Sequence, residues 1–147
     1  YNPRVMQNGE KERKSLPSTL YTEDYFLTAC EGYDVFLESE GQHLSRRLHD
    51  AFALAEVVPG MKVLDVGCGR GEIIRHCMQM GVESYGIDYA EAATRMTREV
   101  IDSEMTNNPD ALNSGVCRSD AKKLPFATGD VDGVLRFGGV GEIYPRG

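Results

Sequence analysis

The sequence predicts an α/β fold in which a doubly wound parallel sheet carries helices on its faces and is preceded by further helices. Two observations carry this prediction. From about residue 61 onward, short apolar runs alternate with segments of helical spacing, in the order strand, helix, strand, helix, strand, which is typical of parallel sheets. The first run also passes directly into a glycine-rich turn that opens a helix. The length of 147 residues suits one domain of this kind.

The composition excludes several broad classes of protein. Apolar residues make up 41% and charged residues 27% of the chain, which is typical of globular proteins rather than disordered ones. The 23 acidic residues outnumber the 16 basic ones, and a phosphate backbone binds best to a basic surface, so we expect no nucleic-acid partner. No apolar run approaches the roughly 20 residues of a membrane-spanning helix. The sequence therefore predicts a protein without a membrane span.

The cysteines and histidines predict neither a disulfide framework nor a metal site. Cys30, Cys68, Cys77 and Cys117 include no Cys-x-x-Cys pair. We expect reduced thiols and, from them, a cytoplasmic protein. The three histidines stand apart from any thiol or acidic cluster with metal-ligand spacing, so we expect them to serve in packing or on the surface.

The chain is predicted to consist of a short arm and one domain. Residues 1–17 are polar and aperiodic and are expected to form a flexible arm. Residues 18–147 form the single domain, which divides into an N-terminal helical region (18–43), a core (44–137) and a tail (138–147). Since the chain begins with tyrosine rather than methionine, we expect a fragment or a trimmed protein.

Helices are predicted ahead of the first strand. Thr22 and Glu23 can start a helix and Gly32 can interrupt it, so two short helices are expected between residues 18 and 38. Apolar residues recur at helical spacing over 44–58, and Pro59-Gly60 ends that pattern.

The core elements follow in regular succession. Each predicted strand is short and apolar or β-branched, and each predicted helix has one apolar side. The strands are expected at 61–66, 83–88, 114–120 and 131–137, and the helices at 71–80 and 90–105.

The segment from Val63 to Glu72 is the most informative one for function. Glycines at 67, 69 and 71 allow backbone angles that other residues avoid, and they let a ligand approach the main chain without meeting a Cβ atom. In doubly wound sheets the ligand lies beyond the carboxyl ends of the strands. Asp65, Asp88 and Asp120 lie at the predicted ends of three strands, so we expect them to line one groove.

The spacing of the glycines limits the kind of ligand. A dinucleotide site would show G-x-G-x-x-G, whereas this turn reads G-x-G-x-G and is followed by Glu72, which would repel a diphosphate. No Lys-Ser or Lys-Thr follows the glycines, which excludes a P-loop. Asp88, at the end of the second strand, can accept hydrogen bonds from both hydroxyls of a ribose. A nucleoside ligand without phosphates fits this pattern.

Three segments in this order resemble the motifs of the class I S-adenosylmethionine-dependent methyltransferases. They read VLDVGCGRG (63–71), YGIDYA (85–90) and SDAKKLPF (119–126). The resemblance covers roughly residues 44–135 and is nearest to the small-molecule group that includes ubiquinone and menaquinone biosynthesis enzymes. It implies a Rossmann-like fold, S-adenosyl-L-methionine as cofactor, and transfer of its methyl group to an unidentified small-molecule acceptor.

The resemblance also implies roles for individual residues. Those assigned to the cofactor's methionine part are Asp65, Gly67, Gly69 and Gly71, with Cys68 inside the same turn. Asp88 would bind the ribose hydroxyls and Tyr89 would pack beside the adenine. Asp120 would accept the adenine amino group, and Ala121 would offer its backbone amide to the ring.

Simpler interpretations of these residues stay open. Asp88 could cap a helix and Asp120 could form a turn, since short acidic residues commonly fill both roles. Cys68 is read as a small filler rather than a nucleophile, because transfer from a sulfonium needs no covalent enzyme intermediate. Tyr25 and Tyr33 are candidates for a lid over the cofactor, or they pack on the sheet. No catalytic residue is assigned.

The end of the sequence departs from the family's pattern. After the fourth predicted strand only a short tail follows, so we expect a core truncated after that strand. Its outer edge would then be unpaired, which favours a homodimer through this edge or an unstable chain. Two other functions stay open, a non-catalytic cofactor-binding module and, less favoured because of Glu72, a nicotinamide-dependent oxidoreductase.

Overall fold

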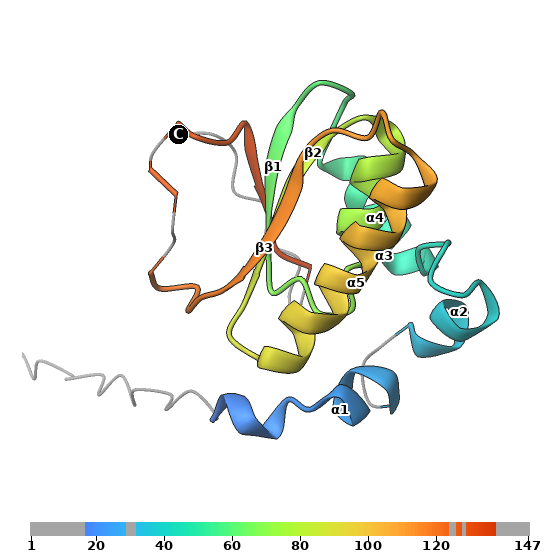
Figure 1. Ribbon diagram of the computed structural model, residues 1–147, viewed down its shortest axis with the longest axis vertical. Coiled ribbons are helices and arrows are strands. Elements are labelled where there is room, and N and C mark those ends of the chain that lie inside the picture. Colours follow the sequence, from blue (N-terminus) through green and yellow to red (C-terminus); the bar gives the residue numbers. More distant parts are fainter. Residues whose placement is uncertain (1–16, 29–31, 124–125, 128, 138–147) are drawn as a thin grey trace, which may run out of the picture.

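The computed structural model describes residues 17–28, 32–123, 126–127 and 129–137. The predicted tail and all but the last residue of the predicted arm lie outside these residues. Within them, four parallel strands form one sheet in the order β3-β2-β1-β4 (Figure 1). The strands are β1 (Lys62–Val66), β2 (Glu83–Asp88), β3 (Ser114–Arg118) and β4 (Gly133–Leu135). The predicted α/β fold with a parallel sheet is confirmed.

The order of the strands reverses at β1. From β1 the chain adds β2 and then β3 on one side, and it returns to place β4 on the other side of β1. Ligands of open α/β sheets bind at such a switch point, beyond the carboxyl ends of the two strands that flank it. The fourth strand pairs with the first, with Leu64 opposite Val134.

The two core helices cover one face of the sheet. They are α4 (Glu72–Met80) and α5 (Glu91–Asn107), and they pack on each other and on β2 (Figure 1). Buried Ile74, Met78 and Ile101 join them in one apolar cluster. On the other face, Leu64, Val66 and Ile87 contact Phe126 and other side chains of the connection between β3 and β4. The described part of this connection contains no helix. Among the described residues, helices therefore cover only the face on which α4 and α5 lie.

The predicted helices before the sheet are present. They comprise a 3₁₀ turn (Ser18–Leu20), α1 (Glu23–Thr28), α2 (Tyr33–Glu38) and α3 (Arg46–Leu54). Gly32 has a φ of +83° and separates α1 from α2. Helix α3 is shorter than predicted, because Ser45 caps its start and Glu56 adopts a left-handed φ of +52° just beyond its end. Buried Phe52 anchors α3 against β1 and α4.

Both outer strands are shorter than predicted. Strand β3 ends at Arg118, two residues early, and β4 has three residues rather than seven. At the start of β4 the Lys62 amide donates to the Asp132 carboxylate at 2.9 Å. The Asp132 side chain thus accepts a hydrogen bond that a backbone carbonyl of a longer β4 would otherwise accept.

Candidate functional site

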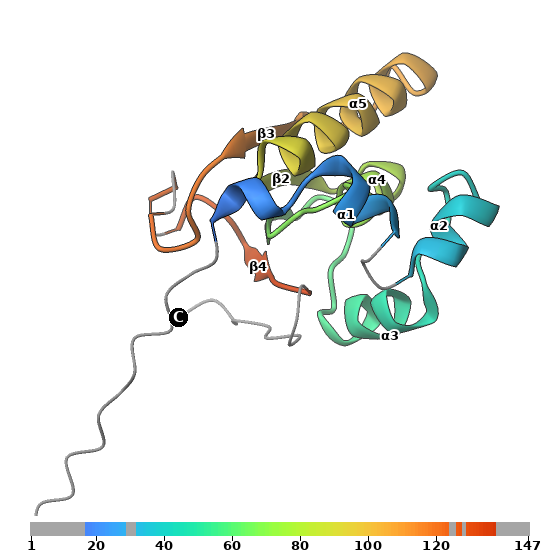
Figure 2. The same ribbon diagram turned by 90° about the horizontal axis from the view of Figure 1, so that it is seen from below.

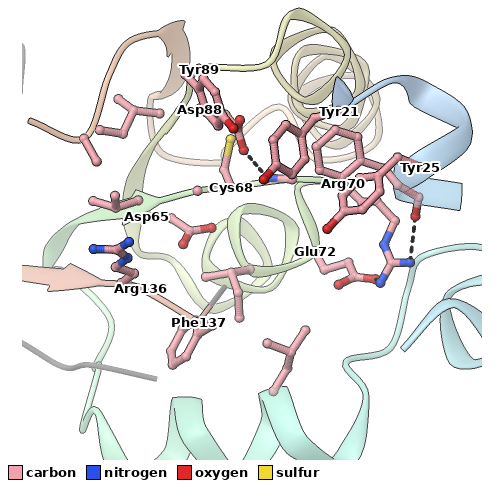
Figure 3. A pocket seen from close by; sticks show the side chains of 18 of the residues that line it. Tyr21, Tyr25, Asp65, Cys68, Arg70, Glu72, Asp88, Tyr89, Arg136 and Phe137 are labelled. Atoms are coloured by element: carbon pink, nitrogen blue, oxygen red, sulfur yellow. Dashed lines mark hydrogen bonds and ion pairs between the residues drawn. The ribbon is translucent and has the colours of Figure 1, made fainter. Parts of the chain in front are cut away.

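A cavity of about 560 Å³ lies at the carboxyl ends of the central strands (Figure 3). Its volume falls within the range of small-molecule sites. Figure 2, which looks at the molecule from below the view of Figure 1, shows α1 passing across this edge of the sheet. Of the residues predicted for the site, those that line the cavity are Tyr25, Asp65, Gly67, Cys68, Gly69, Asp88, Tyr89 and Ala121.

Three predicted site residues lie elsewhere. Gly71 is buried beneath the turn, and a Cβ atom added there would come within 3.1 Å of Thr97 on α5, so this glycine permits close packing of turn and helix. The Asp120 side chain is exposed and accepts the Lys122 amide at 2.9 Å, which is the turn-forming role that the sequence left open. Tyr33 begins α2 and does not line the cavity.

The glycine turn follows β1 and folds back over the end of β2. The amides of Gly67 and Cys68 both donate to the carbonyl oxygen of Ile87, at 2.8 and 3.1 Å. Gly67 has a φ of +76°, and a Cβ atom added to it would have no neighbour within 4 Å. The turn therefore presents bare main chain to an open space, as an approaching ligand requires.

Asp88 connects β2, the glycine turn and α5. One oxygen of its carboxylate accepts the Gly69 amide at 3.1 Å and the other accepts the Ala90 amide at 2.9 Å. Burial raises the pKa of Asp88, and these backbone hydrogen bonds oppose the rise. The backbone amide of Tyr89 also donates to this carboxylate. A carboxylate offers about four acceptor positions, so some acceptor capacity remains for a ligand's hydroxyl group. The N-cap of α5 is Ala90, so the alternative prediction that Asp88 caps a helix is wrong. Its carboxylate instead fixes the backbone between β2 and α5 and is a possible ligand-binding group.

Asp65 is the most perturbed acid in the cavity. Its side chain comes from β1, is only 2% exposed and faces the cavity (Figure 3). Burial raises its pKa to about 7, and the negative charges of Asp88 and Glu72 add to this rise. A cationic group placed beside Asp65 would offset both causes.

Arg70 and Glu72 form a buried pair that the sequence prediction did not foresee. Their side chains approach to 3.0 Å and are 4% and 11% exposed. Glu72 was expected to repel a diphosphate, but Arg70 compensates its charge, so that argument against a dinucleotide is weaker than predicted. The sequence feature that could have indicated this pair is the Arg-x-Glu spacing of Arg70 and Glu72.

Cys68 is buried at the back of the turn. Burial raises the pKa of its thiol, and the nearby charge of Asp65 adds to the rise. The Thr97 hydroxyl donates to its sulfur at 3.4 Å. A thiol that stays protonated is a poor nucleophile, which agrees with the interpretation of Cys68 as a filler.

Aromatic side chains form one wall of the cavity. Tyr21, Tyr25 and Phe26, which we call the aromatic wall, all line it. The ring of Tyr21 contacts those of Tyr25 and Tyr89, with centroids 5.0 and 5.3 Å apart. Tyr25 therefore packs against Tyr21 and Phe26 rather than on the sheet, and it also faces the cavity, so its role in a lid stays a prediction.

The opposite end of the cavity is basic and apolar. Arg47 from α3, and Arg136 and Phe137 after β4, line it there. Arg47 donates to the carbonyl oxygen of Phe137 at 3.4 Å. None of these residues was predicted, because no local motif connects α3 with the end of β4.

Comparison with known proteins identifies the family. Residues 63–145, more than half of the chain, match the family model described as a methyltransferase domain. The chain belongs to this family. An uncharacterized chloroplastic methyltransferase of Arabidopsis thaliana is 36% identical over 77 residues, which are 51% of this chain and 22% of that protein. The chain thus spans about a fifth of the length of this curated relative.

Solved structures share the fold of this methyltransferase domain. One is a SAM-dependent methyltransferase from Thiobacillus denitrificans in complex with S-adenosyl-L-homocysteine, with a TM-score of 0.57 and 18% identity over 84% of this chain and 44% of that one. Another is E. coli YjhP, with a TM-score of 0.57 and 16% identity over 81% of this chain and 43% of that one. At these identities the likeness concerns the fold alone.

Two kinds of feature are missing from the described residues. They contain no group of three or more His, Cys, Asp or Glu side chains placed to hold a metal ion. None of the helices in the described ranges combines the length and the apolar character that crossing a bilayer requires.

Proposed function

We propose that this methyltransferase domain binds S-adenosyl-L-methionine in the cavity and transfers its methyl group to a small-molecule acceptor. The observation that carries the proposal is the pairing of a bare glycine turn with Asp88 at the switch point of the sheet. The open space at Gly67 leaves room for a ligand against the main chain. Membership of the methyltransferase-domain family supports the same conclusion.

The residues of the cavity fit the chemical groups of this cofactor. Asp88 keeps acceptor capacity beyond its bonds to the backbone amides of Gly69, Ala90 and Tyr89, and it would bind the ribose hydroxyls. Asp65 would bind the α-ammonium group, whose positive charge favours the ionised form of this buried acid. Tyr89 and Ala121 line the same cavity and would flank the adenine.

The bound cofactor supplies an activated methyl group on its sulfonium. The role of the chain is to hold the two reactants in line, which can lower the barrier by roughly 7–11 kcal/mol. The turn and Asp88 orient the nucleoside, and the aromatic wall excludes water from it. We assign no general base, and the acceptor's own proton would pass to solvent.

The acceptor is proposed to lie at the end of the cavity beside Arg47, Arg136 and Phe137. This end lies away from Tyr89 (Figure 3), and the whole cavity has the volume of a small-molecule site. The net charge of −7 gives the chain no general attraction for nucleic acid, which supports a small molecule over a polynucleotide.

Isothermal titration tests the proposal directly. The chain should bind S-adenosylhomocysteine and should not bind NADH. Absence of binding to the first, or preferential binding of the second, would refute the assignment. Incubation with labelled S-adenosylmethionine and a panel of small acceptors then separates an enzyme from a non-catalytic binding module, which would bind without turnover.

Two further predictions remain open to experiment. The homodimer would form through the outer edge of β4, which pairs only with β1 among the described residues, and light scattering would detect it. The cytoplasmic location rests on cysteine usage, and Cys68, Cys77 and Cys117 form no disulfide. Imaging of the tagged protein in its native cells would test it.

A further inference from the structure

Arg70 is the one large side chain in the glycine turn, and it points away from the open space above Gly67. The turn reads Gly-Cys-Gly-Arg-Gly from Gly67 to Gly71. The side chain of Arg70 is 4% exposed. It extends from the turn toward α1, on the far side of the cavity from Arg136 (Figure 3).

The guanidinium group of Arg70 contacts three different helices. Its Nη1 donates to the main-chain oxygen of Phe26 on α1 at 3.0 Å. Its Nη2 lies 3.0 Å from Glu72 at the start of α4. The group also stands over the ring of Phe36 on α2, 5.0 Å from the ring centroid, a distance at which a cation is attracted to an aromatic face.

The helix that Arg70 reaches carries Tyr25 and Phe26 of the aromatic wall. Phe26 packs against Ala90, Ala93 and Met96. A Cβ atom added to Gly69 would lie 3.7 Å from the Phe26 ring, so this ring also covers the turn itself. Movement of α1 would therefore uncover the turn and would remove the Tyr25 ring from Tyr21, whose ring contacts Tyr89.

We propose that Arg70 is a positioning residue that couples the glycine turn to the aromatic wall. If α1 moved away, the Arg70 guanidinium would lose the Phe26 oxygen while Glu72 stayed buried beside it. Incomplete satisfaction of a buried charge is costly, so the contacts of Arg70 favour the closed position of α1. A ligand that fixes the turn then fixes α1 as well, and by thermodynamic reciprocity an ordered α1 strengthens ligand binding. This coupling rests on the proposed cofactor site.

A second arginine provides a matched control. Arg95 on α5 also pairs with α1, through Glu23 at 2.9 Å, but these side chains are 51% and 53% exposed. Exposed ion pairs contribute little to stability. The two arginines thus differ mainly in burial and in contact with the turn.

Hydrogen exchange of the full chain, with and without S-adenosylhomocysteine, tests the proposal. The reporter is the peptide covering residues 17–28, and the reference peptides cover β1 and α5. In Arg70→Gln the reporter should exchange about tenfold faster in both states, with little change in the references, and the ligand should dissociate about tenfold faster. Arg95→Gln should resemble the wild type in all these measurements.

Two further variants keep the test decisive. Arg70→Lys preserves the charge beside Glu72 but lacks the pair of nitrogens that contact Glu72 and the Phe26 oxygen separately, so its reporter should stay fast. Slow exchange in this variant would show that the ion pair alone suffices and would overturn the proposal. If Arg70→Gln fails to fold, Phe36→Leu decides, because loss of the ring beneath the guanidinium should speed exchange of the reporter alone.

The outcomes separate this proposal from the proposed function. Unchanged reporter exchange in Arg70→Gln, or in Phe36→Leu when the first variant is unfolded, would overturn the coupling. Absence of ligand binding in the wild type would instead refute the cofactor site, and the ligand-free exchange rates would still measure the contact between Arg70 and α1.

Discussion

Replacement of Asp65 by asparagine should stabilise the ligand-free protein and weaken ligand binding. Asparagine has nearly the same shape but carries no charge. In the folded protein the pKa of Asp65 is about 7, against an ordinary value of 3.8. The difference of about three pKa units corresponds to about 4 kcal/mol of unfolding free energy.

The sign of this effect follows from where each state releases its proton. The unfolded chain loses the Asp65 proton near pH 4, whereas the folded protein keeps it up to about pH 7. Because the folded state binds more protons in this window, the wild type loses stability as the pH rises from about 4 to 7 and levels off above it. Asp65→Asn has no proton to release at this position. Its free energy of unfolding should therefore exceed that of the wild type by about 4 kcal/mol at pH 8 and by less than half of that at pH 5.

Urea unfolding at pH 5 and pH 8 measures this difference, with the exposed Asp102→Asn on α5 as control. Titration with S-adenosylhomocysteine at pH 8 should show binding at least about tenfold weaker in Asp65→Asn, because the ammonium group loses a charged partner. If the difference in unfolding free energy between Asp65→Asn and the wild type does not increase from pH 5 to pH 8, burial does not raise the pKa of Asp65. Unchanged ligand affinity would refute the placement of the ammonium group.

Three more variants probe the turn and the helices. Asp88→Ala should weaken binding of S-adenosylhomocysteine at least tenfold. It should also lower the free energy of unfolding in urea by about 2 kcal/mol, because the amides of Gly69 and Ala90 lose their acceptor. An unchanged thermal melt without ligand would contradict this structural role. Gly71→Ala, with Cβ 3.1 Å from a neighbouring helix, should lower stability by more than Gly60→Ala, which has a similar positive φ and open space, and equal losses would show that strain alone decides. Arg75→Ala removes the cation 2.6 Å from buried Glu104 and leaves it the Gln79 amide at 3.3 Å, so it should cost about 3–5 kcal/mol. A loss below about 1 kcal/mol would show that Gln79 or water compensates for the arginine.

The sequence predicted the elements whose causes are local. The helix expected at 71–80 is observed at Glu72–Met80, and the strand expected at 61–66 at Lys62–Val66. Apolar spacing, the glycine at the helix end and the apolar run are all properties of adjacent residues. The parallel order of the strands followed from their alternation with helices.

The parts of the site that sequence reasoning missed depend on contacts between distant residues. Arg70 contacts Phe26, 44 residues earlier, and Arg47 contacts Phe137, 90 residues later. No spacing rule connects such pairs. Asp120 was expected at a strand end, but β3 stops at Arg118 and the chain then turns, so a shift of two residues leaves the carboxylate exposed outside the cavity.

The position of β4 has a consequence for the order of folding. Lys62 pairs with Glu83, only 21 residues later, whereas Val63 pairs with Gly133, 70 residues later. Closing the longer loop costs about 1 kcal/mol more in chain entropy, and three paired residues return little for it. The unit of β1, α4 and β2 is therefore expected to form first. The part of the cavity at the glycine turn would then form early, and the part lined by Arg136 and Phe137 after β4 would form later.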